Sequence, residues 1–199
     1  GFVLAFLALF DESARIGLAT PGYPPYRHIL TALSLKPVEM QTRIETGFQP
    51  TPNDLAEAGP IDGLILASPA NPTGSMIPPD ALRSLCEVTR ASGTRLISDE
   101  IYHGLSHGTE EACALRFDPD AIILSSFSKF FAMTGWRIGW MIVPDALIGS
   151  VERLQQNLFI CAPSLSQHAA LAALEPEAEA EAVTASGAAL VLTAAAFVF

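Results

Sequence analysis

The sequence has 199 residues, of which half are apolar and 16% are charged, and its formal net charge is −10. This length and composition are those of a globular domain with a sizeable core, not of a disordered chain. An acidic chain without a Lys/Arg cluster is poorly suited to bind polyanions. We therefore expect no nucleic-acid partner, no membrane surface, and small molecules as ligands.

The first part of the chain predicts a mixture of helices and strands. Residues 2–10 are apolar nearly all round, which is typical of a buried helix. The run 15–19 predicts a strand that ends at a Thr-Pro-Gly turn, and 24–35 predicts a helix with prolines in its first turn. An alternating pattern predicts another strand over 38–44.

From residue 52 onward the alternation of helix and strand becomes regular. Pro52-Asn53-Asp54 is expected to cap a short helix that Gly59-Pro60 ends. Buried strands are expected at 63–67, 94–98, 121–125 and 138–143. Helices are expected at 78–91 and 145–157. The pattern predicts an α/β fold with a mostly parallel sheet flanked by helices on both faces.

The two ends of the chain depart from this pattern. The apolar run 1–10 starts at Gly1, with no basic segment before it and no small-residue cleavage site after it. The apolar stretch 185–199 is shorter than the roughly 20 residues of a membrane helix. We expect a fragment that is neither exported nor inserted in a membrane, with an atypical acidic and Ala-rich tail over 175–199 that is disordered or aberrant.

The cysteines and histidines predict neither disulfides nor a metal site. The three cysteines, Cys86, Cys113 and Cys161, lie far apart, and the four histidines show no ligand-like spacing with them. An odd number of cysteines without a paired spacing favours a reducing compartment, so we expect a cytoplasmic location.

Polar clusters follow three of the predicted strands. Asn71 comes after 63–67, and a second cluster from Asp99 to Tyr102 comes after 94–98. The third, from Ser126 to Lys129, comes after 121–125. Because ligands of parallel sheets bind beyond the carboxyl ends of the strands, these clusters predict a single site.

Lys129 is one of only two lysines and lies among aromatic residues just past a buried strand. Low polarity and a nearby cation favour the neutral amine, which suits it to attack a carbonyl. The alternative is a lysine that lays its apolar stem along the strand end and reaches solvent. Alone, Asp99-Glu100 is equally typical of a cap or solvated turn, and Asn71-Pro72-Thr73-Gly74 of a simple turn.

Arg137 lies between two glycines in Gly135-Trp136-Arg137-Ile138-Gly139, at the start of a predicted strand. Glycines let the backbone approach a ligand closely, and the guanidinium fork suits a phosphate.

Together these segments resemble the fold type I pyridoxal-phosphate (PLP) enzymes, and within them the class I/II aminotransferases. NPTG, SDEIY and SxSKxxxMTGWRIGW occur in this order, each after a predicted strand, and the resemblance covers residues 1–174. It implies that 1–174 is a partial PLP-binding large domain.

The resemblance implies a role for each matching residue. Lys129 matches the Schiff-base lysine, which also moves the proton between substrate Cα and cofactor C4′. Asp99 matches the carboxylate that keeps the pyridine nitrogen protonated, so that the ring acts as an electron sink. Tyr102 and Asn71 match the two groups that hydrogen-bond the phenolic oxygen of the cofactor.

The remaining matches concern the phosphate and the ring face. Ser126 and Arg137 match ligands of the cofactor phosphate. Tyr23 matches the aromatic residue that stacks on the pyridine ring, although a tyrosine in a turn explains the same pattern. The phosphate-cradling turn of the family would lie just before Gly1, and the C-terminal small domain, which supplies the substrate-carboxylate arginine, has no match and is expected to be missing.

By resemblance, the activity is transamination between an L-amino acid and a 2-oxo acid in a homodimer. The motifs serve the cofactor, so another outcome on the same fold, such as β-elimination, decarboxylation or condensation, stays open. A third alternative is an inactive truncated fragment.

Overall fold

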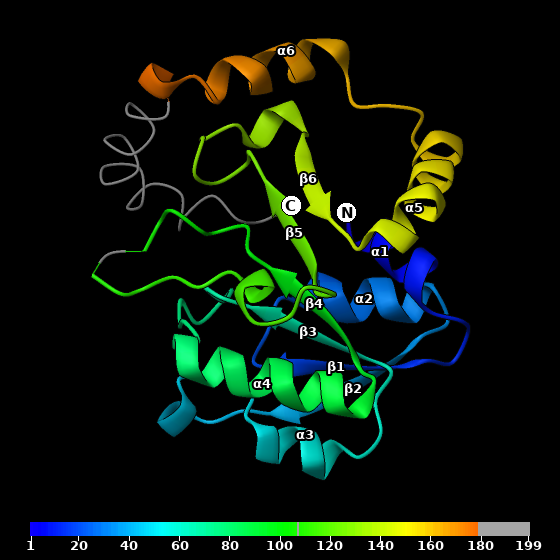
Figure 1. The fold of residues 1–199 in the computed structure, drawn as a ribbon, viewed down its shortest axis with the longest axis vertical. Helices are drawn as coiled ribbons and strands as arrows, with labels where there is room; N and C mark the ends of the chain where they lie inside the picture. The colour runs from blue at the N-terminus through cyan, green and yellow to red at the C-terminus, as the bar shows by residue number, and fades with distance from the viewer. Residues whose placement is uncertain (107, 179–199) are drawn as a thin grey trace.

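The computed structural model describes residues 1–106 and 108–178. Its centre is one six-stranded sheet with the order β2-β1-β3-β4-β5-β6 (Figure 1). The first five strands are parallel, and β6 runs antiparallel to β5. Their bounds are β1 Arg15–Thr20, β2 Lys36–Gln41, β3 Gly63–Ala67, β4 Arg95–Asp99, β5 Ile122–Ser126 and β6 Gly139–Ile142. The predicted mostly parallel α/β sheet is confirmed.

Helices cover both faces of the sheet. They are α1 Phe2–Leu9, α2 Pro24–Ala32, α3 Pro52–Ala58, α4 Pro79–Ser92, α5 Asp145–Leu158 and α6 Ser164–Ala173. Three short 3-10 helices lie between them, η1 Ile44–Thr46, η2 Ala114–Arg116 and η3 Thr134–Trp136. In Figure 1, β1 and β3 lie between α2 on one side and α3 and α4 on the other.

The alternation of side chains along each strand explains why helices pack on both faces of the sheet. In β3, Leu64 and Leu66 pack against α3 and α4, and Ile65 packs against α1 and α2. Because successive side chains of a strand point to opposite faces, a run of apolar residues fills both cores at once. Burying each such side chain contributes about 1.5–3 kcal/mol, so the three residues anchor the central strand firmly.

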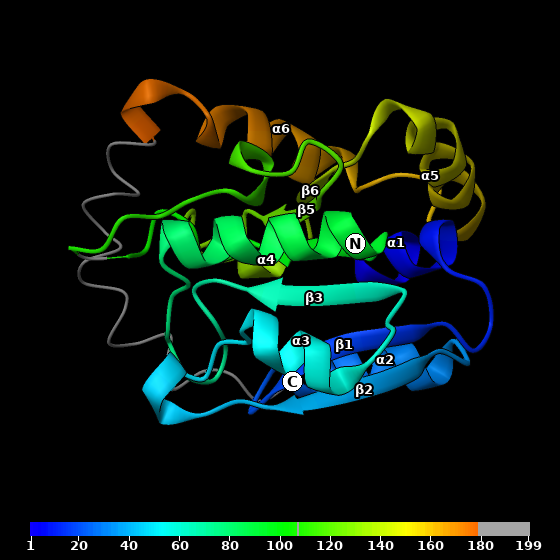
Figure 2. The same cartoon turned by 60° about the horizontal axis from the view of Figure 1, so that its bottom comes forward.

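The C-terminal elements lie at the β6 end of the sheet, away from β2, as both views show (Figure 2). Here β6 and the helices α5 and α6 leave large apolar side chains exposed, among them Trp140, Ile142, Phe159 and Leu165. Of the atypical tail predicted over 175–199, the structure describes only residues 175–178, so that prediction lies largely outside the described residues.

Two predicted elements have wrong boundaries. The strand expected over 38–44 begins at Lys36 and ends at Gln41, and Ile44 instead starts η1 with its side chain 70% exposed. The Thr42 N–H donates to the Thr20 carbonyl, and this is the last hydrogen bond to β1. The pairing stops there because Pro21 ends the neighbouring strand.

The helix expected over 24–35 ends at Ala32. Ser34, two residues after the end of the helix, has a φ of +59°, so the chain leaves the helical path there. The N–H of Leu35 then donates to the carbonyl of Leu30 and caps the C-terminus of the helix. Pro52, Asn53 and Asp54, which were expected to cap α3, form its first turn, and the cap is Thr51. The Thr51 hydroxyl accepts from the Asp54 N–H while the Asp54 carboxylate accepts from the Thr51 N–H.

Within the described part of the chain, no helix is both long and apolar enough to cross a membrane. The same residues contain no group of three or more His, Cys, Asp or Glu side chains placed to hold a metal ion. Both findings concern 1–106 and 108–178 only.

Candidate active site

The carboxyl ends of four parallel strands bring the predicted site residues to one edge of the sheet. β4 ends at Asp99 and β5 ends at Ser126, and the pairing of Asp99 with Leu124 sets these two ends side by side. The loops that follow β1, β3, β4 and β5 carry the other residues, namely Tyr23, Asn71, Tyr102 and Lys129. Arg137 lies at the end of η3, just before β6.

Asp99 is a buried carboxylate, 7% exposed, at the centre of this edge. Burial raises its pKa, because the charged form loses water, while hydrogen bonds from the Tyr26 hydroxyl and the Ile101 N–H act in the opposite direction. These two donors leave part of the acceptor capacity of the carboxylate unused. Asp99 is therefore held in place and can still accept from a cationic N–H.

The sequence reasoning missed Tyr26, which donates its hydroxyl to Asp99 from the first turn of α2. Tyr26 is buried, and its ring packs edge-on against that of Tyr23 at 5.3 Å between centroids. The three-residue spacing of the two tyrosines in PGYPPY was the available signal, since residues i and i+3 share a helix face.

Tyr102 and Asn71 come together although they follow different strands. Burial raises the pKa of the Tyr102 phenol, and the negative charge of Asp99 raises it further. The Asn71 side chain, close enough to interact with the phenol, acts in the opposite direction. The resemblance paired these two residues in one role, and the structure does place them side by side.

Lys129 lies in the same assembly. Its Nζ is 5.7 Å from the centroid of the Tyr102 ring. Burial lowers the pKa of the Lys129 amine, the charge of Arg137 lowers it further, and Asp99 partly offsets both. A lowered pKa increases the share of neutral amine, which is the form that attacks a carbonyl.

Ser126 and Arg137, which the resemblance assigns to the cofactor phosphate, lie at the end of β5 and at the end of η3. The Ser126 hydroxyl accepts from the Ser128 N–H at 2.9 Å, which leaves its own hydrogen available to a ligand. Arg137 has a φ of +53° and donates to the Thr134 carbonyl at 2.8 Å. A Cβ on Gly139 would lie 2.6 Å from the Ser125 carbonyl oxygen, so only glycine lets β6 approach β5 this closely.

Glu100 is a second buried carboxylate next to the site, and the sequence reasoning gave it no role. It accepts from the Ser98 hydroxyl and from the Ala114 N–H, and its other oxygen is 3.3 Å from the ring nitrogen Nδ1 of His103. These contacts tie the turn that carries Tyr102 to the η2 segment.

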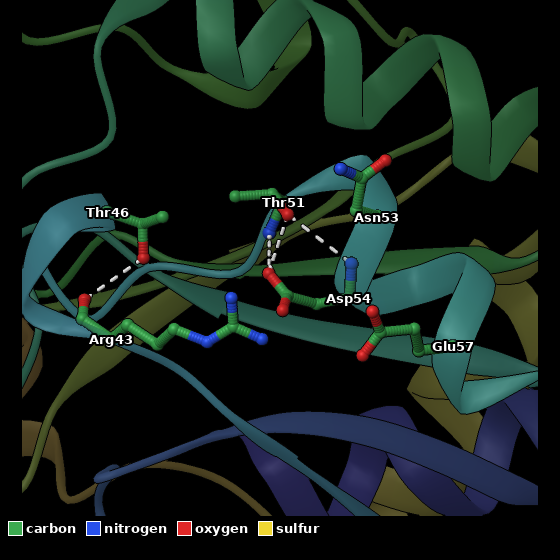
Figure 3. A pocket seen from close by; sticks show the side chains of 6 residues that line it. All are labelled: Arg43, Thr46, Thr51, Asn53, Asp54 and Glu57. Carbon is green, nitrogen blue, oxygen red and sulfur yellow. Dashed lines mark hydrogen bonds between the residues drawn. The ribbon is translucent and has the colours of Figure 1, made fainter.

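A separate cleft of about 240 Å³ lies around the start of α3 (Figure 3). Its lining comes entirely from one stretch of chain and includes Arg43, Thr46, Thr51, Asn53, Asp54 and Glu57. The Thr51–Asp54 pair caps α3, and the Thr46 hydroxyl donates to the Arg43 carbonyl. None of the predicted site residues lines this cleft.

The donor set at the sheet edge fits PLP group by group. An amine with a lowered pKa suits the aldehyde, and a buried carboxylate suits the ring nitrogen. Tyr102 and Asn71 suit the phenolic oxygen, while Ser126 and Arg137 suit the phosphate. This is the chemistry of a PLP-binding large domain.

Comparisons with known proteins agree. The family model of the class I and II aminotransferases matches residues 2–197. Valine–pyruvate aminotransferase of Mycobacterium tuberculosis is 50% identical over 185 residues, which cover 92% of this chain and 48% of that protein. The (5-formylfuran-3-yl)methyl phosphate transaminase of Methanocaldococcus jannaschii is 37% identical over 91% of this chain and 47% of its own length.

A crystal structure of an aminotransferase from Mycobacterium tuberculosis superposes with a TM-score of 0.93 at 48% identity, covering 96% of this chain and 50% of that one. The chain belongs to the class I and II aminotransferases, a family of PLP-dependent transferases. It spans about half the length of the curated relatives it matches.

Proposed function

We propose that this chain contributes the cofactor-binding domain of a transaminase that exchanges the amino group of an L-amino acid for the keto group of a 2-oxo acid. The observation that carries the proposal is the assembly of Lys129, Asp99 and Tyr102, from the ends of two neighbouring parallel strands, around one edge of the sheet. Family membership supports the same reaction class.

PLP, when bound, supplies an aldehyde that captures amines and a ring that withdraws electrons from substrate Cα. Lys129 would hold the aldehyde and, once an amino acid displaces it, carry the proton removed from Cα. Its lowered pKa suits this task, because only the neutral amine can accept a proton. The positive charge of Arg137 contributes to the lowering of this pKa.

Asp99 would keep the pyridine nitrogen protonated. Its burial makes an unpaired charge costly, so a cationic ring nitrogen is the partner that relieves this cost. Tyr102 and Asn71 would hold the phenolic oxygen, Ser126 and Arg137 the phosphate, and Tyr23 one face of the ring. Tyr23 is 37% exposed, which leaves its ring free to stack on a ligand.

The substrate pair remains part of the proposal. The relative at 50% identity is a valine–pyruvate aminotransferase, which makes valine and pyruvate the first pair to assay. Residues 1–174 would form the PLP-binding large domain. We also propose a homodimer, which the exposed apolar side chains of β6 and α5 support. A reducing, cytoplasmic location is a separate proposal, supported by the free thiols of Cys86, Cys113 and Cys161.

Covalent labelling tests the assignment of Lys129. The chain is mixed with PLP, reduced with borohydride and digested, and we expect the label on Lys129. The chain offers a matched control in Lys36, its only other lysine, which lies at the exposed start of β2. Lys129→Ala should carry no label, and its turnover should fall at least about 10³-fold. Lys36→Ala should keep the label and the turnover of the parent chain. A label on Lys36 alone, or equal labelling of both variants, would refute the assignment.

A panel of amino donors tests the reaction itself. Transamination converts PLP to pyridoxamine phosphate, and added pyruvate reverses the conversion. Release of ammonia without pyridoxamine phosphate would identify a β-lyase instead.

A further inference from the structure

Gln49 is a buried amide that neither the predicted site nor the core of the sheet accounts for. Gln49 lies between η1 and α3 along the chain, and the residue is 5% exposed. The amide nitrogen is 3.0 Å from the Ala67 carbonyl, 3.1 Å from the Ser75 carbonyl and 3.2 Å from the Ser75 hydroxyl. One –NH₂ group therefore joins two points that are eight residues apart along the chain.

Those two points are the ends of the loop that carries Asn71. Ala67 is the last residue of β3, and Ser75 follows the NPTG turn. Within the loop, the Ala70 N–H donates to the Ser75 carbonyl and the Gly74 N–H to the Ala70 carbonyl. The amide of Gln49 closes the loop from outside, next to these internal bonds.

The segment that carries Gln49 is itself held on both sides. The Thr46 hydroxyl bridges the carbonyls of Arg43 and Gln49, at 3.1 and 2.9 Å. Directly after Gln49 and Pro50, the reciprocal Thr51–Asp54 cap begins α3, as Figure 3 shows. Gln49 thus projects from a fixed backbone, and its hydrogen bonds transmit that position to the loop.

We infer that Gln49 is a positioning residue for the active site: it fixes the loop that presents Asn71 to Tyr102. The inference rests on the proposed function, in which both residues hold the phenolic oxygen of the cofactor. The choice of glutamine follows from the geometry. Two carbonyls need two hydrogens from one short group, which an amide supplies and which neither a carboxylate nor a thioether can.

The first test needs no cofactor. In Gln49→Met, which keeps the length of the side chain, we expect the amides of Ala70 and Gly74 to exchange their hydrogens at least about tenfold faster. The matched control is Gln41→Met, at the exposed end of β2, which should leave this exchange unchanged. Gln49→Asn keeps the amide but is one methylene too short, so it should act in the same direction should the Met variant fail to fold.

The second test reads the position of Asn71 through PLP. An amide that donates to the phenolic oxygen stabilises the negative charge on that oxygen. If Asn71 is misplaced, this stabilisation is lost, and the pKa of the bound cofactor should rise. In Gln49→Met we expect the midpoint of the visible absorbance titration to rise by about 0.5 pH unit. In an Asn71→Ala background the same substitution should add little, because both changes act on one contact.

The outcomes separate the two proposals. A parent chain with no visible band would reject the PLP-binding function, and the exchange measurement would still decide whether Gln49 holds the loop. Unchanged exchange, or a midpoint shift that persists in full without Asn71, would overturn the role of Gln49. A loss of thermal stability alone, with exchange and midpoint unchanged, would make Gln49 a structural residue only.

Discussion

Two polar clusters in the described part of the chain are built in opposite ways. The cleft around α3 takes all of its lining from residues 43–57, and Arg43, Asn53 and Glu57 are exposed. The site at the sheet edge takes residues from four strand ends and buries Asp99 and Tyr26. Both clusters mix cations and carboxylates, so composition alone does not distinguish them.

The difference lies in what each cluster needs. The Thr51–Asp54 pair is satisfied within one turn of helix, and Arg43, Asn53 and Glu57 are exposed, so local folding explains this cleft. At the sheet edge, burial moves the pKa of Asp99 up and that of Lys129 down, so both charged forms are disfavoured. Such a cluster costs folding free energy that a bound ligand can offset, and perturbed pKa values of this kind cluster at functional sites.

The largest effect is expected at Asp99. Asp99→Ala should lower turnover about 10²- to 10³-fold, because the ring nitrogen loses its counter-charge, while covalent attachment to Lys129 persists. Asp99→Asn should lower turnover similarly, yet it should raise the thermal midpoint at pH 7. Burial raises the folded-state pKa of Asp99, so its charged form costs stability above the unfolded pKa, and a neutral amide removes that cost. Unchanged turnover in both variants would reject the assigned role.

Arg137 should come next. Arg137→Gln should weaken PLP binding about 10- to 100-fold, since a charge-assisted phosphate contact is lost. It should also raise the pKa of Lys129, because the guanidinium lowers it, so the pH at which attachment is half-maximal should move up. Arg137→Lys keeps the charge and should keep that pH while losing affinity. An unchanged pH midpoint in Arg137→Gln would show that the two cations do not interact.

Tyr26 should have a smaller effect. Tyr26→Phe removes the hydroxyl that lowers the pKa of Asp99, so this pKa should rise. As the pH falls, Asp99 should therefore become protonated at a higher pH than in the parent chain. We expect about a tenfold loss of turnover at neutral pH and an acid limb of the pH–rate profile displaced upward. Tyr23→Phe serves as the control, because it keeps the stacking ring and should leave the acid limb in place.

The smallest effect is expected in the cleft. Arg43→Gln and Glu57→Gln should leave turnover within about twofold and the free energy of unfolding within about 0.5 kcal/mol, as for other exposed side chains. Denaturant titration and steady-state rates check both. A tenfold loss of turnover in either variant would place the cleft within the active site and remove the contrast between the two clusters.

The sequence predicted the architecture well wherever periodicity was unambiguous. The buried strands at β3, β4 and β5 and the amphipathic α4 lie within one residue of their expected bounds. The predicted end of α2 was wrong because Ser34 adopts a φ of +59°, and the predicted end of β2 was wrong because a neighbouring strand decides it. β2 ends at Gln41 because β1 stops at Pro21, and nothing within 38–44 reports where the partner strand ends.

The same division holds for the site. Motifs in this sequence named Lys129, Asp99, Tyr102 and Asn71 because their order after successive strands is specific to the family. Tyr26, Glu100 and Gln49 were missed, since each acts through contacts with residues distant in the chain or buried nearby. Tyr26, for example, is 73 residues from the carboxylate it contacts.

The sequence by itself therefore determined the strand–helix order and the sheet with helices on both faces, and it named the candidate reactive groups, because these follow from local pattern and residue chemistry. The tertiary structure alone decided which buried donors hold those groups and how far their pKa values move. Burial and hydrogen bonding depend on the strands and loops that surround a side chain, and these are brought together only when the parallel sheet has formed.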